Sequence, residues 1–442
     1  MNPWSTYEVG LLQQLLTQLA PDVICLSTRS FWTSLGKNII DVVRNGLPDT
    51  PIVAGGWGPS LEPEKYLEYC DYVCFGEGEQ AILEIGKAID SNSNDFSHIN
   101  NLIYKKKGKL IFNESIKPVD NLDLMPFPDF DISGKFLIDD NAQKTGSEFH
   151  NEKIYDIFVG RGCPLNCSYC MSGQWNSLYK INHNHKFPKT RLRSPENCIK
   201  ELEIAKSKGA LFIRIKDEVF PAKKSWVSIF LDLYKKRIDL PFFAYLRPEF
   251  HKSQMLEQLV IAGLKTTGLG IQTGSDIIRK EIYNRKCPND KVMAFARELV
   301  DKNIEFHYDI LCYSPFETLD NLKDTFTFLC TLPICELKVF KLAFFPGAPI
   351  SEMIKKANPV GEKDSVYFFY SVLYCLATHS YFTRSVAKFM EKLGPFYGSA
   401  KILQVLFWPA LFKEKQKRNQ AKKKYKVSSL ILPGMQKKNH QY

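Results

Sequence analysis

Three cysteines that stand close together constrain this chain more than any other feature. Cys163, Cys167 and Cys170 lie in the run Arg-Gly-Cys-Pro-Leu-Asn-Cys-Ser-Tyr-Cys, and the next cysteine, Cys198, lies well downstream. Iron–sulfur clusters are normally held by four thiolates. A cubane cluster bound by only three protein thiolates keeps one iron open, and an open coordination position suits catalysis rather than a closed structural site. The spacing therefore predicts a reactive iron–sulfur centre on one loop.

The cysteine loop follows a predicted strand. Residues Ile154–Val159 are mostly β-branched or aromatic, and Gly160 and Gly162 then interrupt the pattern. Loops that follow the strands of a β/α barrel form its catalytic face. A structural zinc site and three unrelated buried thiols are the alternatives. Zinc would require a fourth ligand nearby, and the nearest histidines, His183 and His185, have no fitting spacing.

This segment resembles the cluster loop of the radical S-adenosylmethionine (SAM) superfamily, with Tyr169 in the aromatic position before the third cysteine. The resemblance implies a [4Fe–4S] cluster whose open iron chelates SAM. One electron, from a donor such as flavodoxin or ferredoxin, then cleaves SAM to a 5′-deoxyadenosyl radical. The implied reaction is hydrogen abstraction from a substrate, or methyl transfer to it. The sequence does not identify that substrate.

Six predicted strands alternate with helices from residue 151 to residue 355, which indicates an α/β fold with a partial (β/α)6 TIM-like barrel. The strands are expected at Ile154–Val159, Leu211–Ile215, Phe242–Leu246, Thr267–Ile271, Phe306–Cys312 and Leu337–Phe344. The helices between them are expected at Pro195–Lys208, Trp226–Lys235, Gln254–Ala262, Asn289–Lys302 and Leu319–Leu332.

Residues 1–90 also alternate short apolar strands with helices, which favours a Rossmann-like parallel sheet. The region resembles the cobalamin-binding domain that often precedes radical SAM barrels. The matching pieces are Asp22–Ser27, Ala54–Pro59 and Asp71–Glu79, the last of which ends Gly-Glu-Gly-Glu.

The resemblance implies that Ser27, Gly55 and Gly56 are candidate cobalamin contacts, because a glycine pair lets a cofactor approach the backbone. An ordinary tight turn is the alternative explanation for the glycines. The opening strands of the resembled domain, with their Asp-x-His-x-x-Gly loop, would precede Tyr7, where only six residues stand. We therefore expect a truncated sheet without a cobalt-ligating histidine.

The resemblance also implies residues that hold SAM, all at the carboxyl ends of barrel strands. Asp217 and Glu218 follow the second strand, where an acidic group complements the methionine ammonium. Arg247 ends the third strand and could grip a carboxylate with two hydrogen bonds. A solvated loop carboxylate is the plain alternative for the two acidic residues.

The fourth strand ends in Gly-Ile-Gln-Thr-Gly-Ser, similar to the family's Gly-x-Glu-Ser-Gly-Ser run. Here Gln272 replaces an acidic residue and Ser275 retains the hydroxyl that faces the ribose and carboxylate. Arg285 matches the arginine of the family's later Asn-Arg pair, with a surface salt bridge as the alternative. The fifth strand departs from the family's Gly-Leu-Pro-Gly-Glu-Thr, since Tyr313 and Phe316 replace its two glycines. Aromatic rings there must stack on the adenine or displace it.

The remaining segments connect and extend the two domains. Residues 91–150 contain a predicted hairpin, Leu102–Tyr104 with Leu110–Phe112, and a proline-rich extended linker. Residues 356–442 form a predicted helical extension, with apolar stretches at Val366–Phe382 and Ile402–Phe412. A helical cap over the barrel is one interpretation of it. Peripheral membrane contact, which would suit a lipid-like substrate, is the other.

The basic charge belongs mainly to the tail. Lys413–Lys426 holds eight Lys or Arg and one Glu, so it carries +7 of the net +11 and leaves +4 for all other residues. A nucleic-acid partner is therefore not expected. Twelve cysteines scattered over a long chain, with no signal peptide, favour a reducing cytoplasm. The expected partner is a small-molecule or lipid-like substrate.

Two rival functions stay open. A non-catalytic binding protein derived from such an enzyme would explain the replaced glycines and the truncated sheet. A tRNA methylthiotransferase-like enzyme would need another cysteine trio near the amino terminus, and Cys25, Cys70 and Cys74 do not have that pattern.

Overall fold

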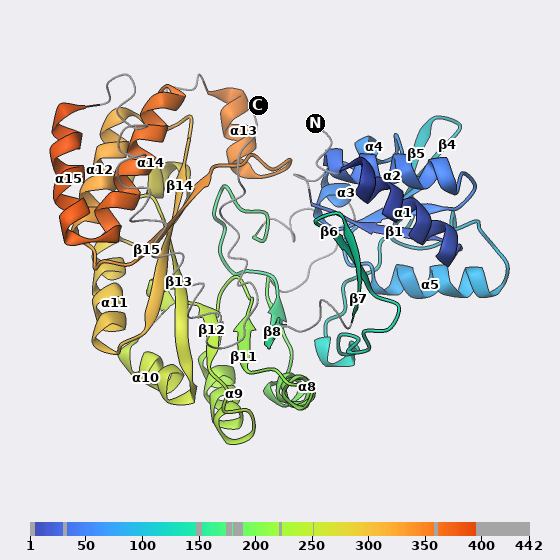
Figure 1. Cartoon of the computed structure of the whole chain (residues 1–442), viewed down its shortest axis with the longest axis horizontal. Coiled ribbons are helices and arrows are strands. Elements are labelled where there is room, and N and C mark those ends of the chain that lie inside the picture. The colour runs from blue at the N-terminus through green and yellow to red at the C-terminus, as the bar shows by residue number, and fades with distance from the viewer. Residues whose placement is uncertain are drawn as a thin grey trace.

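The computed structural model describes residues 5–29, 33–146, 153–173, 179, 189–220, 223–250, 252–357 and 361–394. A small α/β domain lies to one side of a larger barrel-like domain, and carboxyl-terminal helices pack on the barrel (Figure 1). The fold class expected from the sequence is confirmed.

The first domain is built on a five-stranded sheet in the order β1-β2-β3-β4-β5. Its strands β1, β2 and β3 are parallel, and β4 and β5 add to them as an antiparallel hairpin. The hairpin therefore continues this sheet beyond residue 90, where the sequence predicted the domain to end. The strands are Ile24–Ser27, Ile52–Gly55, Tyr72–Cys74, Leu102–Lys106 and Lys109–Phe112, and the helices are α1 (Thr6–Leu19), α2 (Thr33–Gly46), α3 (Trp57–Leu61), α4 (Pro63–Tyr66) and α5 (Glu79–Asp90).

A second hairpin lies between the domains in the sequence. Its strands β6 (Phe136–Asp139) and β7 (Ala142–Thr145) fall where we expected a linker. The turn residues Asp140 and Asn141 have φ angles of 51° and 58°, as a two-residue hairpin turn requires. An Asp-Asn pair between short strands was the signal for it. A helix of the 3-10 type, Leu122–Leu124, precedes the proline-rich stretch.

The barrel domain has a six-stranded, fully parallel sheet in the order β15-β14-β13-β12-β11-β8. Because spatial order follows chain order, the sheet is an open, partial barrel, as predicted. The strands are β8 (Ile154–Ile157), β11 (Phe212–Ile215), β12 (Phe242–Tyr245), β13 (Leu264–Gln272), β14 (Glu305–Cys312) and β15 (Glu336–Lys341), and the helices are α8 (Pro195–Ser207), α9 (Lys224–Arg237), α10 (Ser253–Ala262), α11 (Asn289–Asp301) and α12 (Leu319–Thr331).

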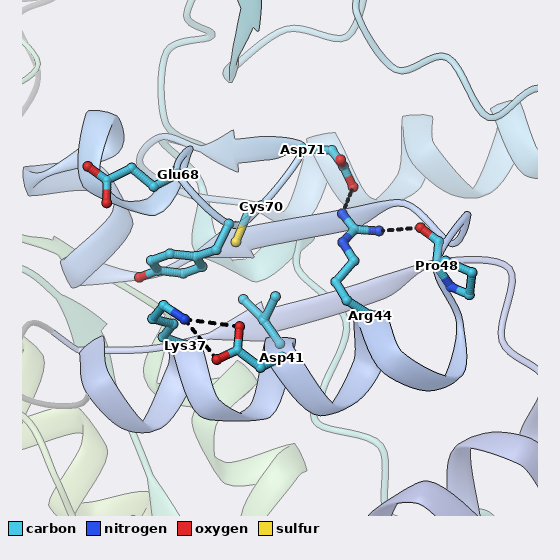
Figure 2. Close-up of a pocket in the computed structure, with 9 residues that line it drawn as sticks. Lys37, Asp41, Arg44, Pro48, Glu68, Cys70 and Asp71 are labelled. Atoms are coloured by element: carbon cyan, nitrogen blue, oxygen red, sulfur yellow. Dashed lines mark hydrogen bonds and ion pairs between the residues drawn. The ribbon is translucent and has the colours of Figure 1, made fainter.

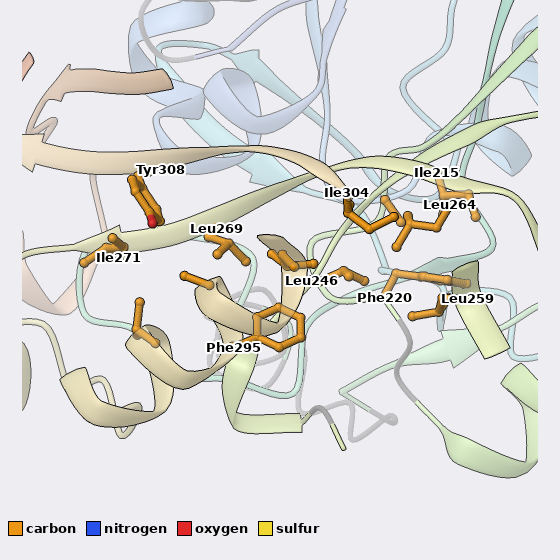
Figure 3. Packing of buried hydrophobic residues seen from close by; sticks show 14 of the residues in the cluster. Ile215, Phe220, Leu246, Leu259, Leu264, Leu269, Ile271, Phe295, Ile304 and Tyr308 are labelled. Atoms are coloured by element: carbon orange, nitrogen blue, oxygen red, sulfur yellow. The ribbon is translucent and has the colours of Figure 1, made fainter. Parts of the chain in front are cut away.

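One face of the barrel sheet is apolar and packs under the helices (Figure 3). Leu269 and Ile271 of β13 and Tyr308 of β14 point into this core together with Phe295 of α11. Residues alternate along a strand, so the intervening side chains lie on the opposite, concave face. Burial of the apolar face fixes the strand register and thereby places the strand ends.

The carboxyl-terminal region is helical, as expected, with α13 (Pro349–Lys356), α14 (Asp364–His379) and α15 (Tyr381–Leu393). Helix α14 packs against α12 and β15, and its Tyr370 and Tyr374 are buried in the barrel core. The apolar stretch Val366–Phe382 is therefore a cap on the barrel. Ile402–Phe412 and Lys413–Lys426 lie outside the described residues. Among the described helices, none has the length and apolar character needed to cross a bilayer.

Candidate active site

The cysteine loop is closed at its base by a short ribbon. Strand β9 (Gly160–Arg161) precedes the cysteines and pairs antiparallel with β10 (Arg191–Leu192), which follows them. Gly162 has a φ of 92°, and a Cβ there would lie 2.1 Å from the Lys189 carbonyl oxygen. Only glycine allows the two segments to approach so closely.

Three hydrogen bonds to the backbone of the cysteine loop hold it against the rest of the barrel. The Ser168 N–H donates to the Tyr283 carbonyl at 3.2 Å, and the Ile350 N–H donates to the Ser168 carbonyl at 3.1 Å. The Asn284 side-chain amide donates to the Asn166 carbonyl at 2.9 Å. The cysteine loop is therefore tied to the segment after β13 and to the start of α13.

The three cysteines fit a cluster better than a zinc ion. Cys163 and Cys167 are buried, Cys170 is half-buried, and none of them is in a disulfide. The pKa of Cys163 is raised to about 11, chiefly by burial and less by the neighbouring Cys170 and Cys167 thiols, while the Leu165 backbone and Arg247 oppose the rise. Over the described residues, no group of three or more His, Cys, Asp or Glu side chains is gathered closely enough for one metal ion. Three thiols on one turn, none of them in a disulfide, are a donor set that fits a cluster.

Tyr169 and Arg285 are brought together. The buried Arg285 guanidinium donates to the Tyr169 hydroxyl at 3.0 Å and to the Gly270 carbonyl at 2.6 Å. Its Nε is buried and makes no hydrogen bond. Arg285 therefore links the cysteine loop to the end of β13, and the surface salt bridge weighed for it is not present in the described contacts.

Asp217 and Glu218 diverge although they are adjacent. Asp217 is buried, and its carboxylate accepts the Val159 N–H at 2.9 Å. Burial raises its pKa to about 7 against the effect of the Val159 backbone. Glu218 is exposed and accepts a hydrogen bond from Ser172, just past the third cysteine, at 3.3 Å. Asp217 thus fastens the strand before the cysteine loop, while Glu218 presents its carboxylate beside the loop.

Arg247 and Gln272 also lie beside the loop. Arg247 is near enough to Cys163 to stabilise its thiolate, and its buried Nε makes no hydrogen bond. Gln272 has a φ of 72°, in the left-handed region that a non-glycine residue seldom adopts. Its amide nitrogen would lie 2.6 Å from a Cβ at Gly270. These two polar groups therefore gather over Gly270.

Ser275 points elsewhere. Its hydroxyl is fully buried and accepts a hydrogen bond from Asn321 of α12 at 3.1 Å. Tyr313 keeps a glycine-like φ of 61°, and its ring packs against Tyr367 of α14 at 5.2 Å between centroids. Phe316 packs with Tyr169 in a small buried cluster. Helix α14 therefore accommodates an aromatic ring where the resembled family has a glycine.

The candidate cobalamin contacts lie together at the carboxyl ends of β1 and β2. Ser27 is exposed and stands opposite Gly55 in the parallel register. Gly56 has a φ of 98°, and a Cβ there would lie 2.7 Å from the Thr28 carbonyl oxygen. The turn alone therefore requires Gly56. An exposed hydroxyl beside two residues without bulk also fits a flat cofactor that approaches the strand ends.

Sequence reasoning missed a polar group on the concave face of the barrel. Lys338 Nζ lies 3.0 Å from His307 Nε2, which lies 3.6 Å from Asp309 Oδ1. Asp309 stands opposite Gly270 in the sheet register, burial raises its pKa to about 7, and Lys338 opposes the rise. Tyr245 and His307 lean over Gly268, where a Cβ would lie within 2.8 Å of both. Period-two alternation along β14 and β15 was the available signal.

One surface hollow among the described residues lies away from the cysteine loop. It measures about 470 Å³ and lies between α2 and the segment Glu68–Asp71 (Figure 2). Lys37 is paired with Asp41, and Arg44 with Asp71. These two ion pairs occupy four of the charged side chains that line the hollow.

Comparisons with known families agree with this division of the chain. The radical SAM superfamily matches residues 157–329, and the B12 binding domain matches residues 11–86. The first match contains all three cysteines, and the second contains the ends of β1 and β2.

Individual relatives are distant. An uncharacterized methyltransferase, PH0819, from Pyrococcus horikoshii is 24% identical over 77% of this chain and 71% of its own length. The anaerobic magnesium-protoporphyrin IX monomethyl ester cyclase of Rubrivivax gelatinosus is 22% identical over 71% of this chain. The cobalamin-dependent radical SAM methyltransferase TokK of Streptomyces tokunonensis is 23% identical over 75% of it. The chain spans 55% and 48% of these last two relatives.

A solved structure has the same fold. The cobalamin-dependent SAM radical enzyme OxsB with aqua-cobalamin bound superposes with a TM-score of 0.63 and 16% identity, over 90% of this chain and 68% of that one. Radical SAM domains work with a [4Fe–4S] cluster and SAM, and B12-binding domains work with cobalamin; the residues at both edges fit these groups. The chain is an enzyme that carries a radical SAM domain, with a B12-binding domain in front of it.

Proposed function

We propose that this enzyme is a cobalamin-dependent radical SAM methyltransferase that acts on a small polar molecule. The observation that carries the proposal is the joining of a three-cysteine loop to a B12-binding domain in one chain. The names of two distant relatives, PH0819 and TokK, favour methyl transfer. When bound, the cluster, SAM and cobalamin supply reductive SAM cleavage and methyl-carrier chemistry.

The residues of the chain would divide the work as follows. Cys163, Cys167 and Cys170 hold the cluster. Glu218 would accept the methionine ammonium, and Arg247, whose Nε makes no hydrogen bond and lies 3.8 Å from the Glu249 carboxylate, would grip a carboxylate. Ser27, Gly55 and Gly56 would meet cobalamin. Asp217, Arg285 and Tyr169 position the loop and its surroundings.

The concave face supports a polar substrate rather than a lipid-like one. The concave face carries His307, Asp309 and Lys338 next to Arg247 and Gln272, since Asp309 stands opposite Gly270 in the sheet register. The buried Asp309 Oδ1 makes no hydrogen bond. An aliphatic chain that covered these groups would remove their water without replacing its hydrogen bonds, which costs free energy. A ligand that donates or accepts hydrogen bonds avoids that cost.

Three partner and location predictions belong to the same proposal. The electron comes from a flavodoxin- or ferredoxin-type donor. None of the twelve cysteines is in a disulfide, which supports a reducing, cytoplasmic location. Peripheral membrane contact would rest on the basic tail, and flotation with anionic liposomes tests it, since a protein that stays at the bottom of the gradient has no such contact.

The alternative is a cyclase or another radical oxidoreductase, because one relative carries a cyclase name. Product analysis separates the candidates. Anaerobically reconstituted enzyme with reductant, SAM and cobalamin should form S-adenosylhomocysteine as well as 5′-deoxyadenosine. 5′-Deoxyadenosine without any S-adenosylhomocysteine favours the alternative, and neither product despite an intact cluster favours a non-catalytic binding protein.

A further inference from the structure

The Gly-Glu-Gly-Glu run after β3 has no role in the site as described so far. It covers Gly76 to Glu79 and leads into α5 of the B12-binding domain. We propose that Glu77 is a positioning residue that holds the cysteine loop at a fixed place against the B12-binding domain. The catalytic meaning of this role rests on the proposed function; the contact itself does not.

The Glu77 carboxylate faces two arginines of the ribbon at the base of the cysteine loop. Arg191 donates to both carboxylate oxygens, one of them at 3.2 Å. Arg161 Nη1 lies 3.2 Å from the same carboxylate, and Arg161 also donates to Glu79 at 2.6 Å. The side chains of Arg191 and Glu77 are only 5% and 14% exposed. Solvent therefore screens this pairing far less than a surface ion pair.

Arg191 is held on its other side as well. The same guanidinium donates to the Val119 carbonyl at 2.6 Å, in the segment that joins the two domains. The Glu77 carbonyl in turn accepts the Asn101 amide at 3.3 Å, next to β4. Glu77 and Arg191 together therefore connect the first sheet, the joining segment and the ribbon.

A third contact comes from within the loop region. Tyr179 is fully buried in the core of the B12-binding domain, where its ring meets Phe75 edge-on. Its hydroxyl accepts the Glu77 N–H at 2.9 Å. Gly76, with a φ of 77°, leaves room for this ring, since a Cβ there would lie 1.7 Å from the tyrosine oxygen.

The order of these contacts along the chain is what points to positioning. Arg161 precedes the cysteines, and Tyr179 and Arg191 follow them, yet all three meet the backbone or the carboxylate of Glu77. A loop tied on both sides to one residue of the neighbouring domain cannot shift without breaking these bonds. The distance between the cluster and the B12 edge is thus set by a few short polar contacts.

A contact that only stabilised the fold would affect hydrogen exchange over a different range of the chain. Its loss would loosen the whole chain, whereas loss of a positioning contact opens the ribbon locally. Hydrogen exchange of the full-length protein without cofactors, followed by mass spectrometry, distinguishes the two. Glu84→Gln is the matched control, because Glu84 is on α5 of the same domain and pairs only with exposed side chains.

We expect Glu77→Gln to accelerate exchange at least tenfold in peptides that contain Gly160–Arg161 and Arg191–Leu192, with β13 and β14 unchanged. Arg191→Gln should give the same result. Exchange in the double variant, Glu77→Gln with Arg191→Gln, should be no faster than in either single variant. Reconstituted Glu77→Gln should also show a broadened EPR signal of the reduced cluster at unchanged iron content.

Glu79→Gln keeps the test usable if Glu77→Gln does not fold. Among the described residues, the Glu79 carboxylate accepts a hydrogen bond from Arg161 but none from Arg191. We therefore expect roughly threefold faster exchange on the Arg161 side of the ribbon. Exchange in Glu77→Gln equal to that in Glu84→Gln, or faster to the same degree along the whole chain, overturns the proposal. The hydrogen-exchange assay needs neither SAM nor substrate. Its result therefore stays valid even if the enzyme does not cleave SAM and the proposed function is wrong.

Discussion

At the scale of single residues, the adjacent carboxylates of Asp217 and Glu218 have different environments and therefore different roles. Asp217 is buried against the Val159 backbone, while Glu218 stays exposed beside the cysteine loop. The sequence placed both after the second barrel strand but could not separate them, because it does not show which carboxylate the strand register buries. Ser275 illustrates the same limit, since its hydroxyl faces Asn321 rather than the loop.

The first prediction concerns SAM binding. Glu218→Gln should raise the KM for SAM by about 10- to 100-fold, because a charge-assisted hydrogen bond contributes about 1.5–3 kcal/mol. SAM cleavage assays at several SAM concentrations measure it. Glu196→Gln, an exposed glutamate at the start of α8, is the control and should keep the wild-type KM. An unchanged KM in Glu218→Gln contradicts the assignment.

The second prediction concerns pH. Burial raises the pKa of Glu317 from 4.5 to about 8, against the Ser314 backbone. Its contribution to stability is therefore complete below pH 4.5 and is lost as pH rises towards 8. One such group lowers the free energy of unfolding by at most about 1.4 kcal/mol per pH unit in this range. Glu317→Gln should therefore make the free energy of unfolding depend less steeply on pH. Urea unfolding at pH 6 and pH 8 measures it. Glu352→Gln, on the surface, should keep the wild-type slope; an equal slope in Glu317→Gln refutes the explanation.

At the scale of elements, α14 acts as part of the barrel. The Tyr374 hydroxyl donates to the Leu322 carbonyl of α12 at 2.9 Å, and its ring is buried. Tyr374→Ala should therefore lower the free energy of unfolding by about 3–5 kcal/mol. Phe389→Ala, at a position of α15 that is 61% exposed, should change it by less than about 0.5 kcal/mol. Equal losses in urea unfolding would show that α14 is not integral to the barrel.

Element positions followed from the sequence because strand and helix periodicity is local. The six barrel strands and their helices lie within a few residues of their expected bounds. The β6–β7 hairpin was missed because four-residue strands give a weak pattern. The pairing of β4 with β3 was missed because it joins segments that are separated in the chain. Local signals predicted the cysteine loop but not the group at His307, Asp309 and Lys338, which forms only when β14 pairs with β15.

At the scale of the whole molecule, the enzyme brings two cofactor edges together in one chain. The barrel presents the cysteine loop, the first domain presents the ends of β1 and β2, and Glu77 joins the loop to that domain. This arrangement has chemical meaning only if the three cysteines bind a cluster with an open iron.

EPR spectroscopy of the anaerobically reconstituted and reduced protein tests that claim most directly. We predict the signal of a reduced [4Fe–4S] cluster, a change in that signal when SAM is added, and its loss in Cys167→Ala. A reduced protein without such a signal, or with a signal that ignores SAM, contradicts the account.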